Sequence, residues 1–409
     1  MISFDRMAEA AKDLDETDPL ARFRGRFLGS ADVVSYLDGN SLGRPPRETD
    51  AVMSEFIRQS WGERLIRGWS DGWLDWPRTL GDRLGEIGLG AAAGQVVVAD
   101  STTVLLYKLA RAALAARPDR REIVLDTDNF PTDRYVLEGI AAECGLALRW
   151  VRTDPAAGIT VEQVAGAVGP DTALVVFSHA AYRSGYVADA EAITRLAHEA
   201  GALILWDLCH SVGVLPVQLD DWGVDLAVGC TYKYLNGGPG SPAFAYVNAH
   251  HHAALHQPIQ GWLGRADPFG MGPGYVPADG IQRFISGTPP ILGMVPLRGA
   301  LDMLAEAGLP AVRAKSLQLT GFVLDFADAE LSRYGVTVAS PRDPARRGGH
   351  ITLRRADFRD ITDRLWERGV IPDFRAPDGI RVGLAPLSTS FTEVFAGLSV
   401  LRELVCATP

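Results

Sequence analysis

The chain has 409 residues and a formal net charge of −10 at pH 7, with 47% hydrophobic and 22% charged residues. This length and composition allow a large core and predict two domains, or one large α/β unit with an appendage. The negative charge argues against nucleic acid or an anionic membrane as the main partner, so an anionic substrate requires a local positive site.

The N-terminal segment, Met1 to Arg26, mixes acidic and basic residues and lacks the continuous apolar core of a signal peptide. No later run is long and uncharged enough to span a bilayer, so we expect a cytoplasmic protein without a membrane partner. The four cysteines show no C-x-x-C spacing, which argues against a disulfide framework or a structural zinc site. A histidine-rich segment at 250–256 invites a metal hypothesis, but it is typical of an exposed loop or helix end, and we predict no metal.

Residues 1–30 are predicted to form an amphipathic helix followed by a loop, because their apolar residues recur at helical spacing. The run Tyr36 to Gly43 predicts a short strand that enters a turn. Residues 49–90 look helical and contain four tryptophans, most of which we interpret as anchors of the core or of a dimer interface: Trp61, Trp69, Trp73 and Trp76.

A strand is predicted from Gln95 to Asp100 and a helix from Val104 to Ala116, with Ser101, Thr102 and Thr103 between them. Hydroxyl groups and free backbone N–H groups at a helix N-terminus form a natural cradle for a phosphate group. The same residues also suit an ordinary N-cap, and this pattern alone leaves both interpretations open.

The next strand, Glu122 to Leu125, leads into Asn129-Phe130-Pro131-Thr132-Asp133. A flat aromatic side chain at a strand end can stack on a pyridine ring. Further strands are predicted at 173–177 and 202–206, on either side of a helix at 189–200. Strands that alternate with helices predict a mostly parallel sheet.

The strand at 202–206 delivers Asp207 at its carboxyl end, with His210 three residues on. The next apolar run ends in Gly229-Cys230-Thr231-Tyr232-Lys233-Tyr234-Leu235-Asn236-Gly237, where one lysine is boxed by tyrosines and glycines. A nucleophilic lysine must lose its proton near neutral pH, which a crowded, partly desolvated setting favours. Lys233 is therefore interpreted as a Schiff-base lysine. An aspartate followed by such a lysine suggests pyridoxal phosphate, whose ring nitrogen an aspartate keeps protonated.

Motifs of other enzyme classes are missing. The sequence contains no G-x-S-x-G elbow of a serine hydrolase and no G-x-x-x-x-G-K-[ST] phosphate loop. The glycine-rich run at 88–94 precedes a strand instead of following one, which argues against a dinucleotide-binding loop.

Beyond residue 290 the pattern predicts a long helical stretch to about Ala327 and then a small α+β unit. Strands are predicted at 350–354 and 379–383, with helices at 358–368 and 392–405. In two-unit enzymes the active site lies in the cleft between the units, so a residue of the small unit can hold the substrate. The strand at 379–383 contains Arg381, and the pattern alone fits an ordinary arginine on a surface strand, although a guanidinium can also hold a carboxylate by two hydrogen bonds.

Several blocks in order resemble the kynureninase family, from about Tyr36 to Leu387: Tyr36-Leu37-Asp38-Gly39-Asn40-Ser41-Leu42-Gly43, Asn129 to Asp133, Asp207-Leu208-Cys209-His210-Ser211, Ala227 to Asn236, and Gly287-Thr288-Pro289-Pro290. The resemblance implies an α/β fold of fold-type I, with a large domain on a mostly parallel sheet and a small α+β C-terminal domain. It divides the chain into an N-terminal helix and segment at 1–48, a large cofactor-binding domain at 49–290 and a small domain at 291–409.

The resemblance also implies pyridoxal 5'-phosphate as cofactor and a role for single residues. Lys233, Tyr232 and Asp207 would be catalytic, with Tyr232 as proton donor or relay at the substrate's carbonyl group. The cofactor would be held by Thr102, Thr103, Phe130, Asp133, Ser178, Asp207, His210, Tyr232, Lys233, Trp262 and Thr288. The substrate would be bound by Arg381, Trp69 and Asn40. The chain departs from the family pattern at Leu105 and at Ser388-Thr389.

The activity that the resemblance implies is hydrolysis of L-kynurenine, or of 3-hydroxykynurenine, to anthranilate or 3-hydroxyanthranilate and L-alanine. It places the enzyme in tryptophan catabolism by the kynurenine pathway, with its link to NAD biosynthesis, as a homodimer whose active sites are shared between subunits. The ring substituent of the substrate, and a biosynthetic pathway that uses a modified kynurenine, stay open.

Two alternatives are weighed against this prediction. A related aminotransferase or cysteine desulfurase of class V has the same fold, but a desulfurase needs a mobile cysteine late in the chain. The only cysteine after Cys230 is Cys406, near the C-terminus. A cofactor-binding protein without catalysis is the second alternative, and no appended interaction segment supports it.

Overall fold

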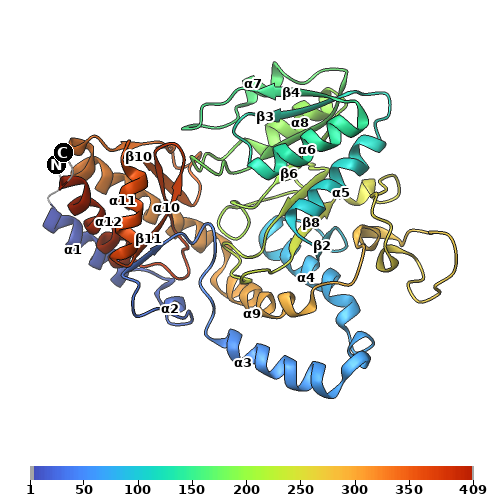
Figure 1. The fold of residues 1–409 in the computed structure, drawn as a ribbon, viewed down its shortest axis with the longest axis horizontal. Coiled ribbons are helices and arrows are strands. Elements are labelled where there is room, and N and C mark those ends of the chain that lie inside the picture. The colour runs from blue at the N-terminus through green and yellow to red at the C-terminus, as the bar shows by residue number, and fades with distance from the viewer. Residues whose placement is uncertain (1–3, 408–409) are drawn as a thin grey trace.

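The computed structural model describes residues 4–407, which form two units that lie side by side, each built on its own sheet (Figure 1). The larger unit contains a seven-stranded sheet in the order β2-β8-β7-β6-β5-β3-β4, and the smaller unit a five-stranded sheet in the order β1-β11-β12-β10-β9. Both ends of the chain lie at the outer side of the smaller unit (Figure 1).

The strands of the large sheet are short and, apart from the edge strand β4, almost wholly buried. They are β2 (Val96–Ala99), β3 (Glu122–Asp126), β4 (Ala147–Val151), β5 (Thr172–Ser178), β6 (Leu203–Asp207), β7 (Leu226–Gly229) and β8 (Ala243–Val247). Among them β8 alone is antiparallel to its neighbours, β2 and β7. The other pairs are parallel. The predicted mostly parallel sheet is therefore confirmed, and its uninterrupted apolar runs reflect burial on both faces.

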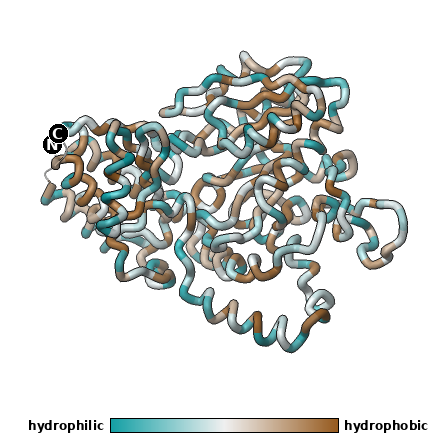
Figure 2. The backbone as a smooth tube through the Cα atoms, viewed as in Figure 1, coloured by the Kyte–Doolittle hydropathy of each residue, from teal (hydrophilic) through white to brown (hydrophobic). Residues whose placement is uncertain are grey.

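Helices cover both faces of this sheet. α5 (Thr102–Ala115) and α6 (Pro131–Cys144) share one apolar cluster with the strands. α4 (Trp76–Leu84), α8 (Ala190–Glu199) and α9 (Ile291–Ala307) contribute to the cluster on the other face. The brown, apolar stretches of chain in the interior of the larger unit follow this layering (Figure 2). α7 (Val161–Ala165) is a short helix before β5, and α3 (Glu48–Glu55) leads to the tryptophan-rich segment.

The smaller unit has its own apolar core, to which the N-terminal helix contributes. Its strands are β1 (Ser35–Leu37), β9 (Thr337–Val338), β10 (His350–Arg354), β11 (Val370–Arg375) and β12 (Gly379–Gly383). Its helices are α1 (Phe4–Glu16), α2 (Ala21–Arg24), α10 (Leu309–Phe326), α11 (Phe358–Glu367) and α12 (Phe391–Cys406). The N-terminal segment thus joins the small unit, because β1 pairs in parallel with β11.

The helical stretch predicted up to about Ala327 is two helices, separated at Gly308, whose φ of 76° is easily adopted only by glycine. α9 buries its apolar side chains in the core of the large unit. α10 passes from that core at Val312 to the core of the small unit at Leu319. The domain limits at 48/49 and 290/291 stay a prediction, and α9 and α10 join the two cores.

Two further observations concern partners and metals. Within residues 4–407 no helix is both long and apolar enough to cross a membrane. In the same range no group of three or more His, Cys, Asp or Glu side chains is placed to hold a metal ion. In the histidine-rich segment, His251 lies 2.6 Å from Asp225 instead, and its neighbours form a short 3-10 helix, Ala249–His251.

Candidate active site

The predicted cofactor residues gather at the edge where the parallel strands of the large sheet end. β7, β6, β5 and β3 are consecutive in that sheet. Lys233 follows β7, Asp207 ends β6, Ser178 ends β5, and Phe130 follows β3. Neighbouring strands therefore bring together side chains that are up to about a hundred positions apart in the chain. In open α/β sheets this carboxyl edge is where ligands bind.

Lys233 differs from the other buried lysines of the chain. The sequence has four lysines, of which Lys108, Lys233 and Lys315 are buried. Lys108 pairs with Asp100 at 2.7 Å and Lys315 pairs with Asp18 at 2.8 Å. Among the residues that the structure describes, no carboxylate lies within ion-pair distance of Lys233, whose Nζ has only the Nε2 atom of His210 at 3.3 Å. An amine that is only 8% exposed and has no counterion is poised for a ligand.

Asp207 is held in place by hydrogen bonds from its surroundings. Its Oδ1 accepts the backbone N–H of Cys209 at 2.8 Å, and the Ser178 hydroxyl lies 3.3 Å from its Oδ2. The same hydroxyl lies 2.7 Å from Asn129 Oδ1, so Ser178 connects the ends of three strands. No ion pair of Asp207 occurs within residues 4–407, which leaves a buried carboxylate able to accept a cationic ring nitrogen.

Asp133, in the first turn of α6, is fully buried and its Oδ2 has no hydrogen-bond partner. Burial, with Asp207 and Asp126 nearby, raises the pKa of Asp133 well above its ordinary value. Two neighbouring carboxyl groups cannot both ionise cheaply in a poorly solvated site. The raised pKa of Asp133 favours its protonated form next to Asp207.

An aromatic and imidazole wall surrounds the lysine. Lys233 Nζ lies 5.9 Å from the ring centroid of Phe130, whose ring meets that of Tyr182 edge-on at 5.4 Å. The rings of His210 and His350 are 5.8 Å apart. Burial and the nearby charge of Lys233 lower the pKa of His210 well below its ordinary value, so its imidazole is neutral and can accept a hydrogen bond.

The residues of the predicted phosphate cradle lie at the N-terminus of α5. Ser101 caps the helix by accepting the N–H of Val104, and Thr102 Oγ1 lies 3.9 Å from Cys209 Sγ, next to the Asp207 segment. Thr103 follows in the first turn, where helix N–H groups are free of intrahelical partners. Asp100 precedes the cap with a left-handed φ of 45°. Lys108 fixes this unusual backbone from within the helix by donating to Asp100 Oδ2 and to the Phe284 carbonyl, both at 2.7 Å.

Arg381, in β12 of the small unit, reaches across to the large unit. Its Nη1 donates to the carbonyl of Tyr182 at 2.7 Å, and its Nη2 donates to the Ser41 hydroxyl at 2.9 Å. Asp373 in β11 accepts from its Nε at 2.6 Å. The side chain of Arg381 is only 1% exposed, and burial lowers its pKa from the ordinary value. Arg381 thus joins the small unit to the large one, and most of its donors are already engaged.

The segment Asp38–Gly43 lies between Arg381 and the lysine loop. Gly43 donates its N–H to the Tyr232 carbonyl at 2.8 Å, and a Cβ at Gly43 would come within 2.4 Å of the Lys233 carbonyl oxygen. Asn40 is fully buried against Gly383, and neither atom of its amide has a partner. Asp38 Oδ1 is likewise unpartnered, and burial raises the pKa of Asp38 to about 6.

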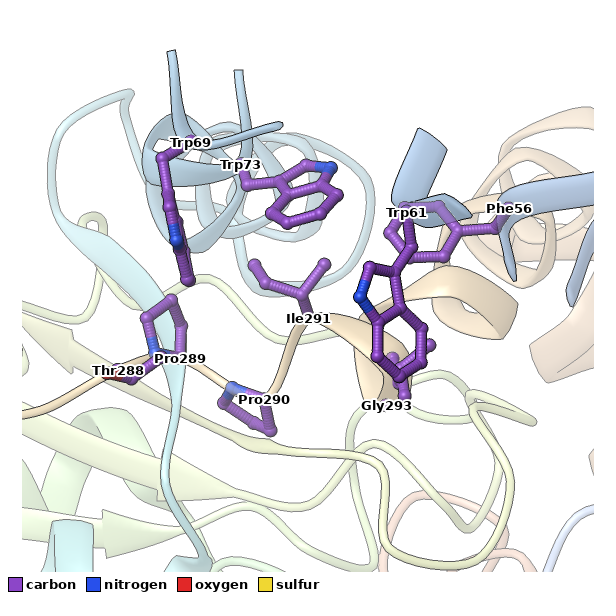
Figure 3. Close-up of a pocket in the computed structure, with 10 residues that line it drawn as sticks. Phe56, Trp61, Trp69, Trp73, Thr288, Pro289, Pro290, Ile291 and Gly293 are labelled. Atoms are coloured by element: carbon purple, nitrogen blue, oxygen red, sulfur yellow. The ribbon is translucent and has the colours of Figure 1, made fainter. Parts of the chain in front are cut away.

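Trp69 and Thr288 lie elsewhere, in a pocket of about 280 Å³ that none of the strand-edge residues lines. The indole ring of Trp69 stands above Pro289 and Thr288, that of Trp73 lies above Ile291, and Trp61 lies on the other side near Gly293 (Figure 3). Trp69 meets Trp73 edge-on at 5.4 Å. Trp262 begins a short 3-10 helix before an exposed arm at 265–277 and packs against Phe269 of that arm. Within one chain, Trp69 and Thr288 thus line a pocket to which Lys233 does not contribute, and Trp262 contacts the exposed arm.

Comparison with known sequences identifies the family of the chain. Residues 312–401 match the family model of the kynureninase C-terminal domain. The kynureninase of Pseudomonas fluorescens is 41% identical over 399 residues, which cover 96% of this chain and 94% of the relative. A kynureninase of Burkholderia pseudomallei (strain 1106a) is 41% identical over 404 residues, 97% of this chain and 95% of the relative. The chain belongs to the kynureninase family.

Solved structures support the fold-type I architecture of this kynureninase family member. A mutant of the lyase C-DES, with glycine covalently linked to its PLP cofactor, superimposes with a TM-score of 0.81 at 19% identity and covers 92% of this chain and 98% of its own. The apo cysteine desulfurase of Thermococcus onnurineus NA1 gives 0.79 at 18%, over 97% and 98%. At these identities the likeness shows the fold alone.

As a kynureninase family member, the chain is a pyridoxal phosphate-dependent hydrolase that acts on a carbon–carbon bond. The residues present fit this cofactor. A buried lysine without a counterion and a buried carboxylate without a cationic partner are the amine and the acid that this cofactor needs, and the unpartnered carboxyl group of Asp133 lies near that carboxylate. Phe130 and the N-terminus of α5 offer a ring platform and a phosphate cradle at the same edge.

The structure also brings residues to the site that the sequence did not indicate. Asp373 and Ser41 bind Arg381, Tyr182 packs edge-on against Phe130, and the ring of His350 lies near that of His210. The run Val370–Arg375 contains a proline and alternates poorly, so neither β11 nor the position of Asp373 was predicted. Ser41 lies in a family block, but nothing in that block points to an arginine 340 positions away.

Proposed function

We propose that the enzyme hydrolyses L-kynurenine or 3-hydroxykynurenine to the corresponding anthranilate and L-alanine, in the cytoplasm, as part of tryptophan catabolism. The observation that carries this proposal is Lys233, a buried amine without a counterion. From the small unit, Arg381 donates to the carbonyl of Tyr182, whose ring packs on Phe130 beside that lysine. An amine to hold the cofactor and a guanidinium to hold an α-carboxylate are the two groups that an amino-acid substrate requires.

Bound pyridoxal phosphate supplies an aldehyde and an electron-withdrawing ring that stabilises negative charge at the substrate's α-carbon. Asp207, which lies near Asp133, would hold the ring nitrogen. Lys233 moves the proton at the α-carbon. Burial raises the pKa of Tyr232 above its ordinary value, so its hydroxyl stays protonated and can donate to the substrate's γ-carbonyl oxygen. Ser178 and His210 orient the carboxylate and the amine, respectively.

The direct test is a steady-state comparison of kynurenine and 3-hydroxykynurenine, following the aromatic product and L-alanine separately. We expect one aromatic acid and one alanine for each substrate consumed. Consumption without L-alanine would contradict the proposed cleavage, and a transamination product in its place would indicate the aminotransferase alternative. The ratio of kcat/KM values for the two substrates then shows which ring the enzyme prefers.

A second prediction concerns the substrate's carboxylate. Arg381→Lys should raise KM by roughly 10- to 100-fold, because a lysine cannot make two parallel hydrogen bonds and a hydrogen bond to a charged group contributes about 1.5–3 kcal/mol. kcat should change much less. Arg354→Lys is the matched control, since Arg354 pairs with Asp378 in the same sheet. An unaltered KM in the Arg381 variant would move the carboxylate site elsewhere.

We further propose that two copies form a homodimer and share their active sites. Support comes from the pocket of Trp69 and Thr288, which is apolar, open and separate from Lys233 within one chain. Trp61 at its rim is 50% exposed, and Phe269 and Met271 of the neighbouring arm are 59% and 71% exposed. Large exposed apolar groups of this kind mark an interaction surface. Trp262 and Thr288 would then reach the phosphate of the partner's cofactor, and Trp69 the ring of its substrate.

The desulfurase alternative is disfavoured by the position of the cysteines. Cys209 and Cys230 are buried, and Cys144 ends helix α6. Cys406 is exposed but lies in the last turn of α12, a regular helix of the small unit. A desulfurase needs a reactive cysteine on a mobile segment that reaches the cofactor, and none of these positions provides it.

A further inference from the structure

The donors of Arg381 are almost fully used before any substrate binds. A guanidinium has five N–H donors. Asp373 Oδ2 takes the edge formed by Nε and Nη2, at 2.6 and 2.5 Å. Ser41 Oγ takes a second donor of Nη2 at 2.9 Å, and the Tyr182 carbonyl takes one of Nη1 at 2.7 Å. One N–H, on Nη1, is left, whereas a bidentate carboxylate needs two.

The three acceptors differ in how easily a substrate can replace them. Asp373 is a charged acceptor on a neighbouring strand, in register with Arg381, and its hydrogen bonds are charge-assisted. The Tyr182 carbonyl belongs to the backbone of the large unit. Ser41 offers a neutral hydroxyl from the segment Asp38–Gly43. When this hydroxyl moves away, the edge of the Arg381 guanidinium formed by Nη1 and Nη2 becomes accessible. A carboxylate is a stronger acceptor than a hydroxyl, so exchange favours this edge.

Burial leads to the same conclusion. Arg381 is 1% exposed, so a substrate can reach it only where a covering group gives way. Around it, Asp38 Oδ1, both amide atoms of Asn40 and the hydroxyl of Tyr234 are buried and unpartnered. Ser41 connects this segment to the guanidinium, and Asn40 lies against Gly383, two positions from Arg381 in the chain. Several buried polar atoms without hydrogen-bond partners in one place favour a rearrangement of the segment Asp38–Gly43 when a ligand binds.

We propose that Asp373 is a positioning residue that holds the Nε/Nη2 edge of Arg381 throughout the reaction, and that the Ser41 hydroxyl is a temporary ligand that the substrate's α-carboxylate displaces from the Nη1/Nη2 edge. Arg375, whose Nε lies 2.8 Å from the same Asp373 oxygen, steadies Asp373 from the other side. The inference rests on the proposed function, because it takes Arg381 as the carboxylate-binding residue.

Asp373→Asn should raise KM for kynurenine by about tenfold, because the guanidinium of Arg381 is then no longer held with its Nη1/Nη2 edge toward the substrate's carboxylate. We expect kcat to fall by less than about threefold. The α-carboxamide of kynurenine, which offers no carboxylate, serves as a competitive inhibitor. Its affinity should be the same for the wild-type enzyme and for the Asp373→Asn variant. Asp378→Asn is the matched control. It removes the carboxylate of the Arg354 pair in the same sheet and should leave KM unchanged.

For Ser41→Ala we do not expect an increase in KM. A displaced ligand opposes binding, so its removal should leave KM unchanged or lower it, whereas a direct substrate ligand would raise it. A tenfold increase in KM for Ser41→Ala would overturn the exchange. Thermal unfolding of each variant separates folding from binding. If the Asp373 variant unfolds early, the comparison is repeated with Asp373→Glu, which keeps the charge and should restore most of the affinity.

Failure of the inference can be told from failure of the proposed function. An Arg381→Lys enzyme with an unaltered KM would remove Arg381 from the carboxylate site altogether. If that variant binds weakly but Asp373→Asn binds normally, the proposed function stands and the positioning role of Asp373 is wrong. The double variant should be little worse than Arg381→Lys alone, because residues that act through one group are not additive.

Discussion

Lys233→Ala should abolish turnover and the covalent attachment of the cofactor together. Proton transfer by a positioned group contributes roughly 10²- to 10⁴-fold, and the same amine also anchors the cofactor, so kcat should fall by more than about 10³-fold. No other lysine can replace it. Lys108 and Lys315 are held in buried ion pairs with Asp100 and Asp18, at 2.7 and 2.8 Å.

Attachment is measured independently of activity by borohydride reduction, proteolysis and mass spectrometry. The wild-type protein should carry the added cofactor mass on the peptide that contains Lys233, and the variant on no peptide. Lys12→Ala, which removes the exposed lysine of α1, is the control and should behave as wild type. Recovery of the cofactor mass on Lys108 or Lys315 in the wild-type protein would contradict the assignment.

The part of the candidate site at the strand edge was predictable from the sequence, because its polar and charged residues come directly at the ends of apolar runs. Asp207, Ser178 and Lys233 each follow a buried strand, and parallel strands end at one edge. The alternation of strands and helices was sufficient for the fold class. The one reversed strand, β8, was not foreseen, since an apolar run of five residues says nothing of its direction.

What sequence reasoning missed depends on burial and on pairing between distant segments. Whether Arg381 is free or engaged is decided by Asp373 across a strand pair and by Ser41 at the far end of the chain. Asn40 was predicted as a substrate ligand from the family block alone. Its buried and unpartnered amide gives that prediction a physical basis. The separation of Trp69 and Thr288 from Lys233 could not be read from residue order either.

That separation leads to the second large effect. Thr288→Asp should nearly abolish activity by placing a negative charge against the cofactor's phosphate in a poorly screened site, and it should weaken cofactor binding measured on the apoprotein. If Thr288 belongs to the partner's active site, Thr288→Asp in one chain damages the partner's site. The site that contains the Lys233 of that same chain is left intact by this chain's substitution. Two inactive variants can then restore one another.

Subunits that carry Lys233→Ala are therefore mixed with subunits that carry Thr288→Asp. In a mixed dimer, one site receives both lesions and the other combines wild-type Lys233 with wild-type Thr288. Random exchange makes half of the dimers mixed, each with one working site, so activity should return to about one quarter of the wild-type level. Mixing Lys233→Ala with Asp207→Asn is the matched control, because both residues end neighbouring strands of one sheet and no intact site can form. If exchange is verified by mass and the first mixture stays inactive, Thr288 serves its own chain and the shared-site proposal is wrong.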